Sequence, residues 1–461
     1  MSRPPKVPPT GNGPNSSGEP PPANPTPSPP RKTPGRGSKA THVALPLATI
    51  AAISVLAGHV TPPSGPGSTP PSATAPAPLI SGHEVQWWAV FKFNAAAEPT
   101  SPTDVGRQCT FGGTVNTTYK SFSQNYIVAS ADDPEFKTGQ GLAGVGPDDP
   151  LGSTYQQIYN GHYHYVVWND QFQDAPKIAH CTHECGAPWG HAKGLLAWDD
   201  AGDGMILQVT TPSWPGAASA AAPRTDDGNT LGCTKDNNLL FSQDFFALQL
   251  TKSDVVQVLR ALSNASVVTD PSNPQLVNNG GPADISTLVA QLGQQSTSTD
   301  PMIATLSSGI ELISKPSKLP VPPWQLVSAE LGSTPLKVAS WWAWPTIPST
   351  DGTTKPGCWD DTKLAKPGAV TIVHSGLWQG KTIGLNGGDG AEGNHAKLGV
   401  SVGLAHNYAI FGDMNQQGAL NDNCKSSQNG RGGMFFVVQN DGLATSLSSL
   451  LTDTTATEKT N

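Results

Sequence analysis

The chain has 461 residues, a formal net charge of -8 at pH 7 and a charged fraction of only 13%. That length allows two ordinary domains or one large one with a substantial core. The acidic balance excludes a strongly basic domain that binds DNA over a broad surface, but it leaves room for an enzyme that gathers positive charge locally. The 49 glycines and 44 prolines are typical of a loop-rich α/β protein.

The N-terminal part reads as three segments that precede the folded body. Residues 1–41 are Pro-rich and almost free of apolar side chains, which predicts a disordered tail. Residues 42–59 are apolar but shorter than the ~20 residues of a comfortable transmembrane helix, which favours a signal peptide or signal anchor over a buried helix. A Pro/Ser linker over 60–82 leads to a catalytic domain over 83–440, and a flexible tail follows over 441–461. We therefore expect an exported protein (secreted, periplasmic or lumenal), with membrane contact only through the apolar segment.

The folded body mixes both kinds of secondary structure. Strands are predicted where aromatic and β-branched residues run together, and helices where apolar residues recur every three or four positions. The predicted strands lie at 84–94, 163–171, 338–345, 369–376 and 433–440, and strand–turn–strand units at 197–209 and 397–415. The predicted helices lie at 253–265, with Ser253 as its N-cap, and at 284–293 and 302–314.

Six cysteines fit the disulfides of an exported protein. They are Cys109, Cys181, Cys185, Cys233, Cys358 and Cys424. The tract HCTHECG at 180–186 also has two histidines, so a zinc site is the alternative there. We expect disulfides, whose connectivity the sequence does not give.

The tripeptide His-Ala-Lys occurs twice, as His191 to Lys193 and as His395 to Lys397. Each copy stands ahead of a predicted strand, turn and strand. Because side chains alternate between the faces of a strand, each copy would present one imidazole and one cation on the same side. Two copies predict a shared ligand, whereas the alternative for either copy is a solvated strand edge.

The sequence around both tripeptides resembles the deoxyribonuclease II family, whose fold is related to phospholipase D. The resemblance rests on GHAKGLLAWDD with a later PSWP, on NHAKLGVS followed by FGDMN, and on the strands QWWAVFKF and VVWNDQ. It runs in collinear order from about Val85 to Gln439, and it departs from the family at Leu398, where an aromatic residue is usual. The resemblance implies an α/β, phospholipase D-like fold with two pseudo-repeated α/β sandwich halves forming one central active-site cleft.

The resemblance also implies a chemistry. It implies a DNA endonuclease that works at acid pH without metal or other cofactor, through a phosphohistidine, and leaves 3'-phosphate ends. His191 would be the nucleophile and His395 the general acid, although the reverse order also satisfies the chemistry. Lys193 and Lys397 would hold the non-bridging oxygens of the phosphate, and Asn415 would add an amide donor.

Five further residues are weaker candidates for orienting the histidines or contacting DNA. Asp170 or Asp199 would orient a histidine, and Asp413 would do so or cap a turn. Ser213 and Trp214 lie in the PSWP motif, where the tryptophan would stack on bases or pack in the core. A phosphodiesterase acting on another substrate and a catalytically silent surface module remain as alternative functions. The sequence does not indicate the oligomeric state.

Overall fold

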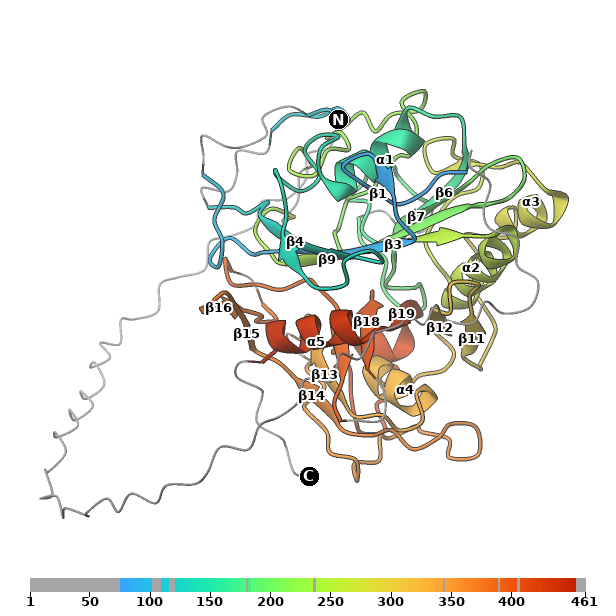
Figure 1. Cartoon of the computed structure of the whole chain (residues 1–461). Coiled ribbons are helices and arrows are strands. Elements are labelled where there is room, and N and C mark those ends of the chain that lie inside the picture. Colours follow the sequence, from blue (N-terminus) through green and yellow to red (C-terminus); the bar gives the residue numbers. More distant parts are fainter. Residues whose placement is uncertain are drawn as a thin grey trace, which may run out of the picture. The chain divides into compact units, whose positions relative to one another are not determined.

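The computed structural model describes residues 75–101, 109–115, 121–179, 181, 183–234, 238–342, 345–388, 390–403 and 407–452. The expected tail, the expected signal segment and residues 60–74 of the expected linker lie outside this range. The described residues all belong to a unit that spans Pro63–Asn461. Within them, no helix has the length and apolar character needed to cross a membrane. They form a mixed α/β structure, as expected (Figure 1).

The first sheet has eight strands in the order β10-β6-β7-β8-β9-β3-β4-β5, all paired antiparallel. Its central strands are buried on both faces, which explains why they appear in the sequence as continuous apolar runs. The strands are β3 (Trp87–Lys92), β4 (Tyr126–Ser130), β5 (Lys137–Thr138), β6 (His164–Asn169), β7 (Lys193–Trp198), β8 (Gly204–Val209), β9 (Gln243–Leu250) and β10 (Val277–Asn278).

The second sheet has seven strands in the order β11-β12-β19-β18-β17-β13-β14, and only the β13–β14 pair is parallel. Two short hairpins, β1–β2 and β15–β16, stand apart from both sheets. The remaining strands are β1 (Leu79–Ile80), β2 (His83–Glu84), β11 (Met302–Thr305), β12 (Glu311–Lys315), β13 (Leu336–Ala339), β14 (Val370–Ile372), β15 (Ser375–Trp378), β16 (Lys381–Gly384), β17 (Leu398–Ser401), β18 (Tyr408–Gly412) and β19 (Gly433–Gln439).

Five α-helices and one short 3₁₀ helix accompany the sheets in the described part of the chain. Helix α2 begins at a capping box, in which the Thr251 hydroxyl and the Asp254 carboxylate each accept from the other's main-chain N–H, so Thr251 rather than Ser253 is the N-cap. The helices are α1 (Pro150–Tyr159), α2 (Lys252–Ala265), α3 (Ala283–Val289), α4 (Pro323–Glu330), α5 (Asp441–Leu450) and η1 (Ser427–Gly430).

Aromatic side chains join the two sheets face to face. Phe246 of β9 stacks on Phe411 of β18, with ring centroids 4.8 Å apart, and its centroid lies 5.5 Å from that of Phe436 in β19. On the other face of the second sheet, Trp324 of α4 packs against Phe435 of β19 at 5.1 Å. Since neighbouring residues of β19 point to opposite faces, this strand packs against the first sheet through Phe436 and against α4 through Phe435.

Strand direction brings chemically active segments to the same edge of each sheet. In the first sheet, β6 and β8 end where β7 and β9 begin, and in the second sheet β18 ends where β17 and β19 begin. Both His-Ala-Lys tripeptides lie at such edges, because β7 begins at Lys193 and β17 begins at Leu398. The residues that immediately follow β6, β8 and β18 lie at these edges too.

The structure corrects several expected elements. The tract 302–314 is the β11–β12 hairpin and not a helix, because Gly309, at φ 81°, turns the chain between two strands. The strand expected over 338–345 ends at Ala339. Residues 441–450, expected in a flexible tail, form α5, whose apolar face is buried. Residues 75–82 were expected to be linker, yet Ala77 is buried and Leu79–Ile80 form β1.

All six cysteines are paired, as expected. The disulfides are Cys109–Cys233, Cys181–Cys185 and Cys358–Cys424. Both cysteines of the HCTHECG tract bind each other, which leaves no thiolate there for zinc. Three disulfides are consistent with an oxidising compartment.

Candidate active site

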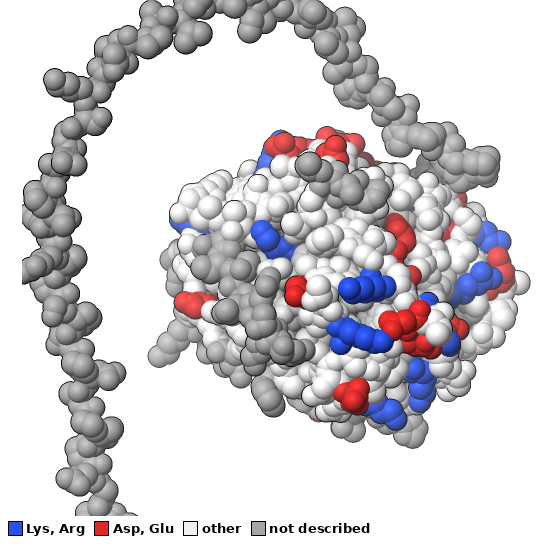
Figure 2. Space-filling model, turned by 90° about the horizontal axis from the view of Figure 1, so that it is seen from below, with Lys and Arg blue, Asp and Glu red and all other residues white. Residues whose placement is uncertain are grey.

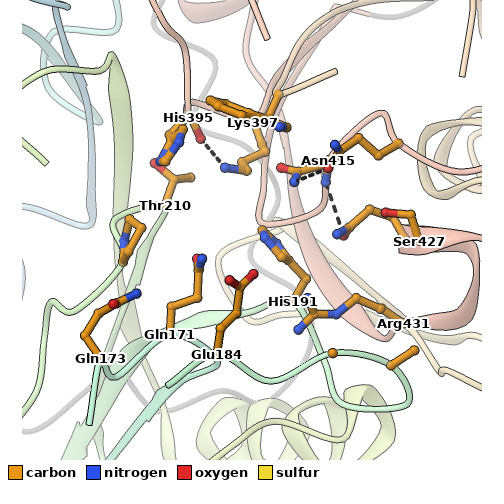
Figure 3. A pocket seen from close by; sticks show the side chains of 16 residues that line it. Gln171, Gln173, Glu184, His191, Thr210, His395, Lys397, Asn415, Ser427 and Arg431 are labelled. Carbon is orange, nitrogen blue, oxygen red and sulfur yellow. Dashed lines mark hydrogen bonds between the residues drawn. The ribbon is translucent and has the colours of Figure 1, made fainter. Parts of the chain in front are cut away.

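The two sheet edges border one cavity of about 800 Å³. Its wall contains both histidines of the repeated tripeptide and is mainly polar (Figure 3). The lining residues are Gln171, Gln173, Glu184, Gly186, Ala187, His191, Thr210, Pro212, Trp341, His395, Lys397, Asn415, Gln417, Ser427, Gln428 and Arg431.

Each histidine of the repeated tripeptide is anchored to the opposite sheet. The main-chain N–H of His191 donates to the carbonyl of Gly432, directly before β19, at 2.8 Å. The main-chain N–H of His395 donates to the carbonyl of Ser242, directly before β9, at 2.8 Å. Because each histidine is anchored to the opposite sheet, the two tripeptides border one cavity although they lie 204 positions apart (395 minus 191).

Gly432 makes the first anchor sterically feasible. A Cβ atom at this position would lie 2.1 Å from the carbonyl oxygen of Ala265, at the end of α2. Only glycine therefore lets the segment before β19 pass so close to the helix.

The ring of His191 is held by a hydrogen bond to the main chain. Its Nδ1 lies 2.5 Å from the carbonyl oxygen of Asp413. A carbonyl can only accept, so Nδ1 carries the hydrogen and Nε2 keeps its lone pair. Burial, followed by the positive charge of Lys193, lowers the pKa of His191 well below its usual range. The neutral imidazole is thus the form that a nucleophile requires.

The ring of His395 is held by aromatic packing. It stacks on Phe241 with centroids 4.4 Å apart and meets Trp341 edge-on at 4.7 Å. Burial, followed by the charges of Lys397 and Lys193, lowers its pKa well below the usual range. A proton on His395 therefore requires acid or a nearby anion.

Asp170 joins two cations below the cavity. Its carboxylate oxygens accept from Nζ of Lys193 at 2.6 Å and from Nη2 of Arg431 at 2.7 Å, and the carboxylate is fully buried. Burial alone would raise the pKa of Asp170, but the charges of Lys193, His191 and Arg431 hold it well below its usual range. Lys193 is outside the set of lining residues, whereas Arg431 lines the cavity.

A buried lysine supports the segment that carries Arg431. Nζ of Lys315, the last residue of β12, donates to the carbonyls of Asn429 at 2.9 Å and Arg431 at 2.7 Å. Burial lowers the pKa of Lys315 to about 7. Below that pH its ammonium holds both carbonyls in place.

Lys397 lines the cavity and is fixed through its own main chain. Its Nζ donates to the carbonyl of His395, and its main-chain N–H donates to Oδ1 of Asp244 at 2.6 Å. Burial, followed by the charge of Lys193, lowers the pKa of Lys397 to about 7. An anion in the cavity would favour its charged form.

Asn415 and Asp413 take different places. Asn415 lines the cavity, and its Nδ2 donates to Oε1 of Gln417 at 2.9 Å. Asp413 is outside the set of lining residues, its carboxyl accepts from the main-chain N–H of Met434 at 2.9 Å, and burial raises its pKa well above the usual range. Asp413 therefore orients His191 through its carbonyl and not through its carboxylate.

Three further candidate residues, in addition to Lys193, Asp170 and Asp413, lie outside the cavity wall. Oδ1 of Asp199 caps the turn between β7 and β8, at the opposite end of β7 from Lys193. Trp214 is buried in the core against Tyr155, where its indole N–H donates to a main-chain carbonyl. Ser213, at φ 58°, is fully buried beside it.

The cavity also contains residues that we had not predicted from the sequence. Arg431 is the most important of these, because it adds a cation to the wall; an arginine between glycines in GRGG shortly before the last strand was the available signal. Gln171, Glu184, Thr210 and Trp341 had no such signal. In the described part of the chain, no group of three or more His, Cys, Asp or Glu side chains is placed to hold a metal ion.

Two cations, Lys397 and Arg431, line the cavity, and the face of the molecule shown in Figure 2 has no extended basic area. On the face shown in Figure 2, basic and acidic side chains are mixed, and most of the visible described surface is uncharged. This pattern agrees with the net charge of -8. The face shown therefore lacks the broad basic surface of a protein that binds a long duplex.

The family model for Deoxyribonuclease II matches residues 79–457. No curated protein matches the chain. The matched segment is well over half of the 461 residues and contains both tripeptides and every lining residue of the cavity.

Proposed function

Since the chain belongs to the deoxyribonuclease II family, whose members are nucleases that hydrolyse DNA, we propose that it is a metal-independent acid endonuclease acting through a phosphohistidine. The observation that carries this proposal is the reciprocal anchoring of His191 and His395 at one cavity. Two imidazoles at one phosphate can divide nucleophilic attack and proton transfer between them.

In the first step, Nε2 of His191 attacks phosphorus. The N–P bond forms as the bond from phosphorus to the 5' oxygen breaks, and His395 gives its proton to that oxygen. The products are a phosphohistidine that carries the 3' side of the strand and a free 5'-hydroxyl. The hydrogen bond from Nδ1 to the carbonyl of Asp413 supports this assignment, because it leaves Nε2 free to attack.

In the second step, neutral His395 takes a proton from water. The oxygen of that water attacks phosphorus, and the N–P bond breaks. The product is a 3'-phosphate, and both imidazoles return to their starting state. The lowered pKa of His395 supports an acid optimum, because this general acid must gain its proton before cleavage begins.

Cations around the cavity would stabilise the charge that develops on phosphorus. Lys397 and Arg431 line the cavity and can donate to the non-bridging oxygens. Lys193 acts on the phosphate through its charge while it holds Asp170, which in turn positions Arg431. Asn415 adds an amide from the cavity wall. Together these groups would supply the charge stabilisation that a metal ion provides in other nucleases.

We also propose that the two sheets are pseudo-repeated halves of a phospholipase D-like fold. The order β6-β7-β8-β9-β3 matches the order β13-β17-β18-β19-β12, with antiparallel pairing throughout both sets. Lys92 ends β3 and Lys315 ends β12, and each buried ammonium donates to the carbonyl of the next residue. A repeated buried lysine at equivalent strand ends supports duplication of one unit.

Plasmid nicking in EDTA at pH 5 and pH 8, followed by end-group analysis, tests the proposal. We expect cleavage at pH 5, little at pH 8, and 3'-phosphate ends. Loss of cleavage in EDTA or the appearance of 5'-phosphate ends would contradict the mechanism. Hydrolysis of phospholipid without DNA cleavage would favour a different phosphodiester, although the polar wall of the cavity supports a nucleic acid. Inactivity on both substrates would leave a binding module.

A further inference from the structure

One wall of the cavity presents a carboxylate in a site proposed for an anion. Glu184 lines the cavity together with Gln171 and Gln173. In Figure 3 these three side chains point into the cavity from the side opposite His395 and Lys397. Within the described residues, no hydrogen bond or ion pair uses any of the three side chains, so their polar atoms are available to a ligand.

The backbone that carries these side chains is fixed on both sides of Glu184. The main-chain N–H of Cys185 donates to the carbonyl of Asp170 at 2.8 Å, and that of Gln173 donates to the carbonyl of His183 at 3.2 Å. The disulfide Cys181–Cys185 closes the same segment. Gln173 has φ 57°, a conformation that residues other than glycine rarely adopt outside constrained sites.

The chemistry of this wall differs from that of the phosphate-binding wall. An ionised carboxylate only accepts hydrogen bonds and repels phosphate, whereas it pairs well with an amino group. The two amides can both donate and accept. The cavity, at about 800 Å³, lies in the range that encloses a drug-sized ligand, so it has room for a base beside the phosphate.

We propose that Gln171, Gln173 and Glu184 form a subsite for a nucleobase next to the cleaved phosphate, and that it prefers bases with an exocyclic amino group. Cytosine, adenine and guanine carry such a group, and thymine does not. The base must leave its stack to reach the wall, as in single strands or in nucleotides flipped out of a duplex. This inference rests on the proposed nuclease function and names a specificity that the function alone does not require.

Oligonucleotides with one variable base test the subsite. The substrates are labelled dT 12-mers that contain a single dC, dA or dG, and cleavage is mapped at every phosphate in EDTA at pH 5. The readout is cleavage beside the variable base divided by cleavage at dT–dT steps in the same molecule, so a change in overall rate cancels. We expect a preference of at least about five-fold beside amino-bearing bases, the lower end of what one base contact contributes.

Variants of the wall then assign that preference to its residues. Glu184→Ala should bring the ratio to about one, Glu184→Gln should reduce it, and Gln173→Ala should change which amino-bearing base is favoured. Glu135→Gln, at an exposed carboxylate outside the cavity, should leave the ratio unchanged. An absent preference, or a preference that survives Glu184→Ala, would overturn the subsite while the nuclease function stands. Failure of the unaltered protein to cleave any substrate would overturn both.

Discussion

Replacing the two histidines singly and together tests whether they share one phosphate. Loss of a nucleophile or general acid costs on the order of 10⁴-fold in kcat, or about 5.4 kcal/mol at about 1.36 kcal/mol per tenfold. Independent contributions would multiply to on the order of 10⁸-fold in the double variant. Residues that act as one unit are strongly non-additive, so we expect His191→Ala, His395→Ala and the double variant to agree within about ten-fold.

Stability must be followed in the same variants, because His191 is buried. Its removal leaves the carbonyl of Asp413 without the ring donor, which costs about 1–3 kcal/mol for an unsatisfied buried group. Thermal unfolding should therefore show a small decrease in Tm and a cooperative transition. His164→Ala, at the far end of β6 from the site, is the matched control and should keep full cleavage.

The assay is single-turnover cleavage of supercoiled plasmid in EDTA at pH 5. Covalent trapping of a radiolabelled substrate phosphate on the protein provides a second readout. The His395→Ala variant lacks the proposed general acid and water activator but keeps the proposed nucleophile, so trapped label in this variant reports attack by His191. A single variant that keeps about half of the activity would refute the shared site. A double variant far below both singles would show that the two histidines act separately.

Three further predictions follow from the site and the domain boundary. Arg431→Ala should lower kcat/KM by about 10²–10³-fold, as the loss of a donor that stabilises charge in the transition state does. Arg260→Ala, at an exposed arginine outside the cavity, should have no effect. Equal kcat/KM values for the two variants would show that Arg431 does not act in the site. Lys397→Met should shift the alkaline limb of the kcat profile, measured over pH 4–8, to higher pH. Burial and then the charge of Lys397 lower the pKa of His395, so removal of that charge should let the general acid keep its proton to a higher pH. A limb that does not move would contradict this prediction. A chain that begins at Ser81 should have a free energy of unfolding in urea about 2–4 kcal/mol lower than one that begins at Ala75. The shorter chain lacks the hydrogen bonds from residues 77–79 to α1 and the buried contacts of these residues. Equal unfolding midpoints would show that residues 75–80 are a linker and not part of the folded domain.

Apolar patterning was sufficient to predict the centre of each sheet. Segments such as QWWAVFKF and GMFFVVQN are buried on both faces, so their composition alone marks them as strands. The tract 302–314 misled because its apolar residues recur at a spacing that a hairpin and a helix can share. Residues 441–450 carry many serines and threonines, and only the packing of Leu443 and Leu447 reveals a helix.

The residues that border the cavity could be predicted where the side chain itself forms the recognisable pattern. Both tripeptides have a recognisable pattern, but the ring partner of His191 is a carbonyl 222 residues away, and a carbonyl leaves no mark in a sequence. Asp170 and Asp199 each follow a strand, and only the sheet decides that Asp170 faces the cations while Asp199 caps a turn at the other edge. The acidic residue that orients a cation thus could not be separated from the one that shapes a loop.

The charges around the cavity link substrate binding to proton uptake. Lys397 and Arg431 line it, and Lys193 lies beside Arg431 on Asp170. Burial raises the pKa of Asp413 well above its usual range and that of Asp244 to about 7, whereas the charges of Lys193, His191 and Arg431 hold the pKa of Asp170 well below its usual range. Of these three buried carboxyls, Asp170 is therefore the one that stays ionised at acid pH and offsets the cations. Burial, followed by the charges of the neighbouring lysines, lowers the pKa of both imidazoles in the folded protein below the unfolded value near 6.5. The unfolded chain then binds more protons below about pH 6.5, so these two histidines reduce stability as the pH falls through that value. An oxyanion in the cavity supplies negative charge and raises both pKa values, so binding of sulfate, which does not titrate in this range, should take up protons at pH 5 to 6 and raise Tm more than it does at pH 8. Calorimetry in two buffers of different ionisation enthalpy measures that uptake, and sulfate binding without it would show that the imidazoles do not face the anion.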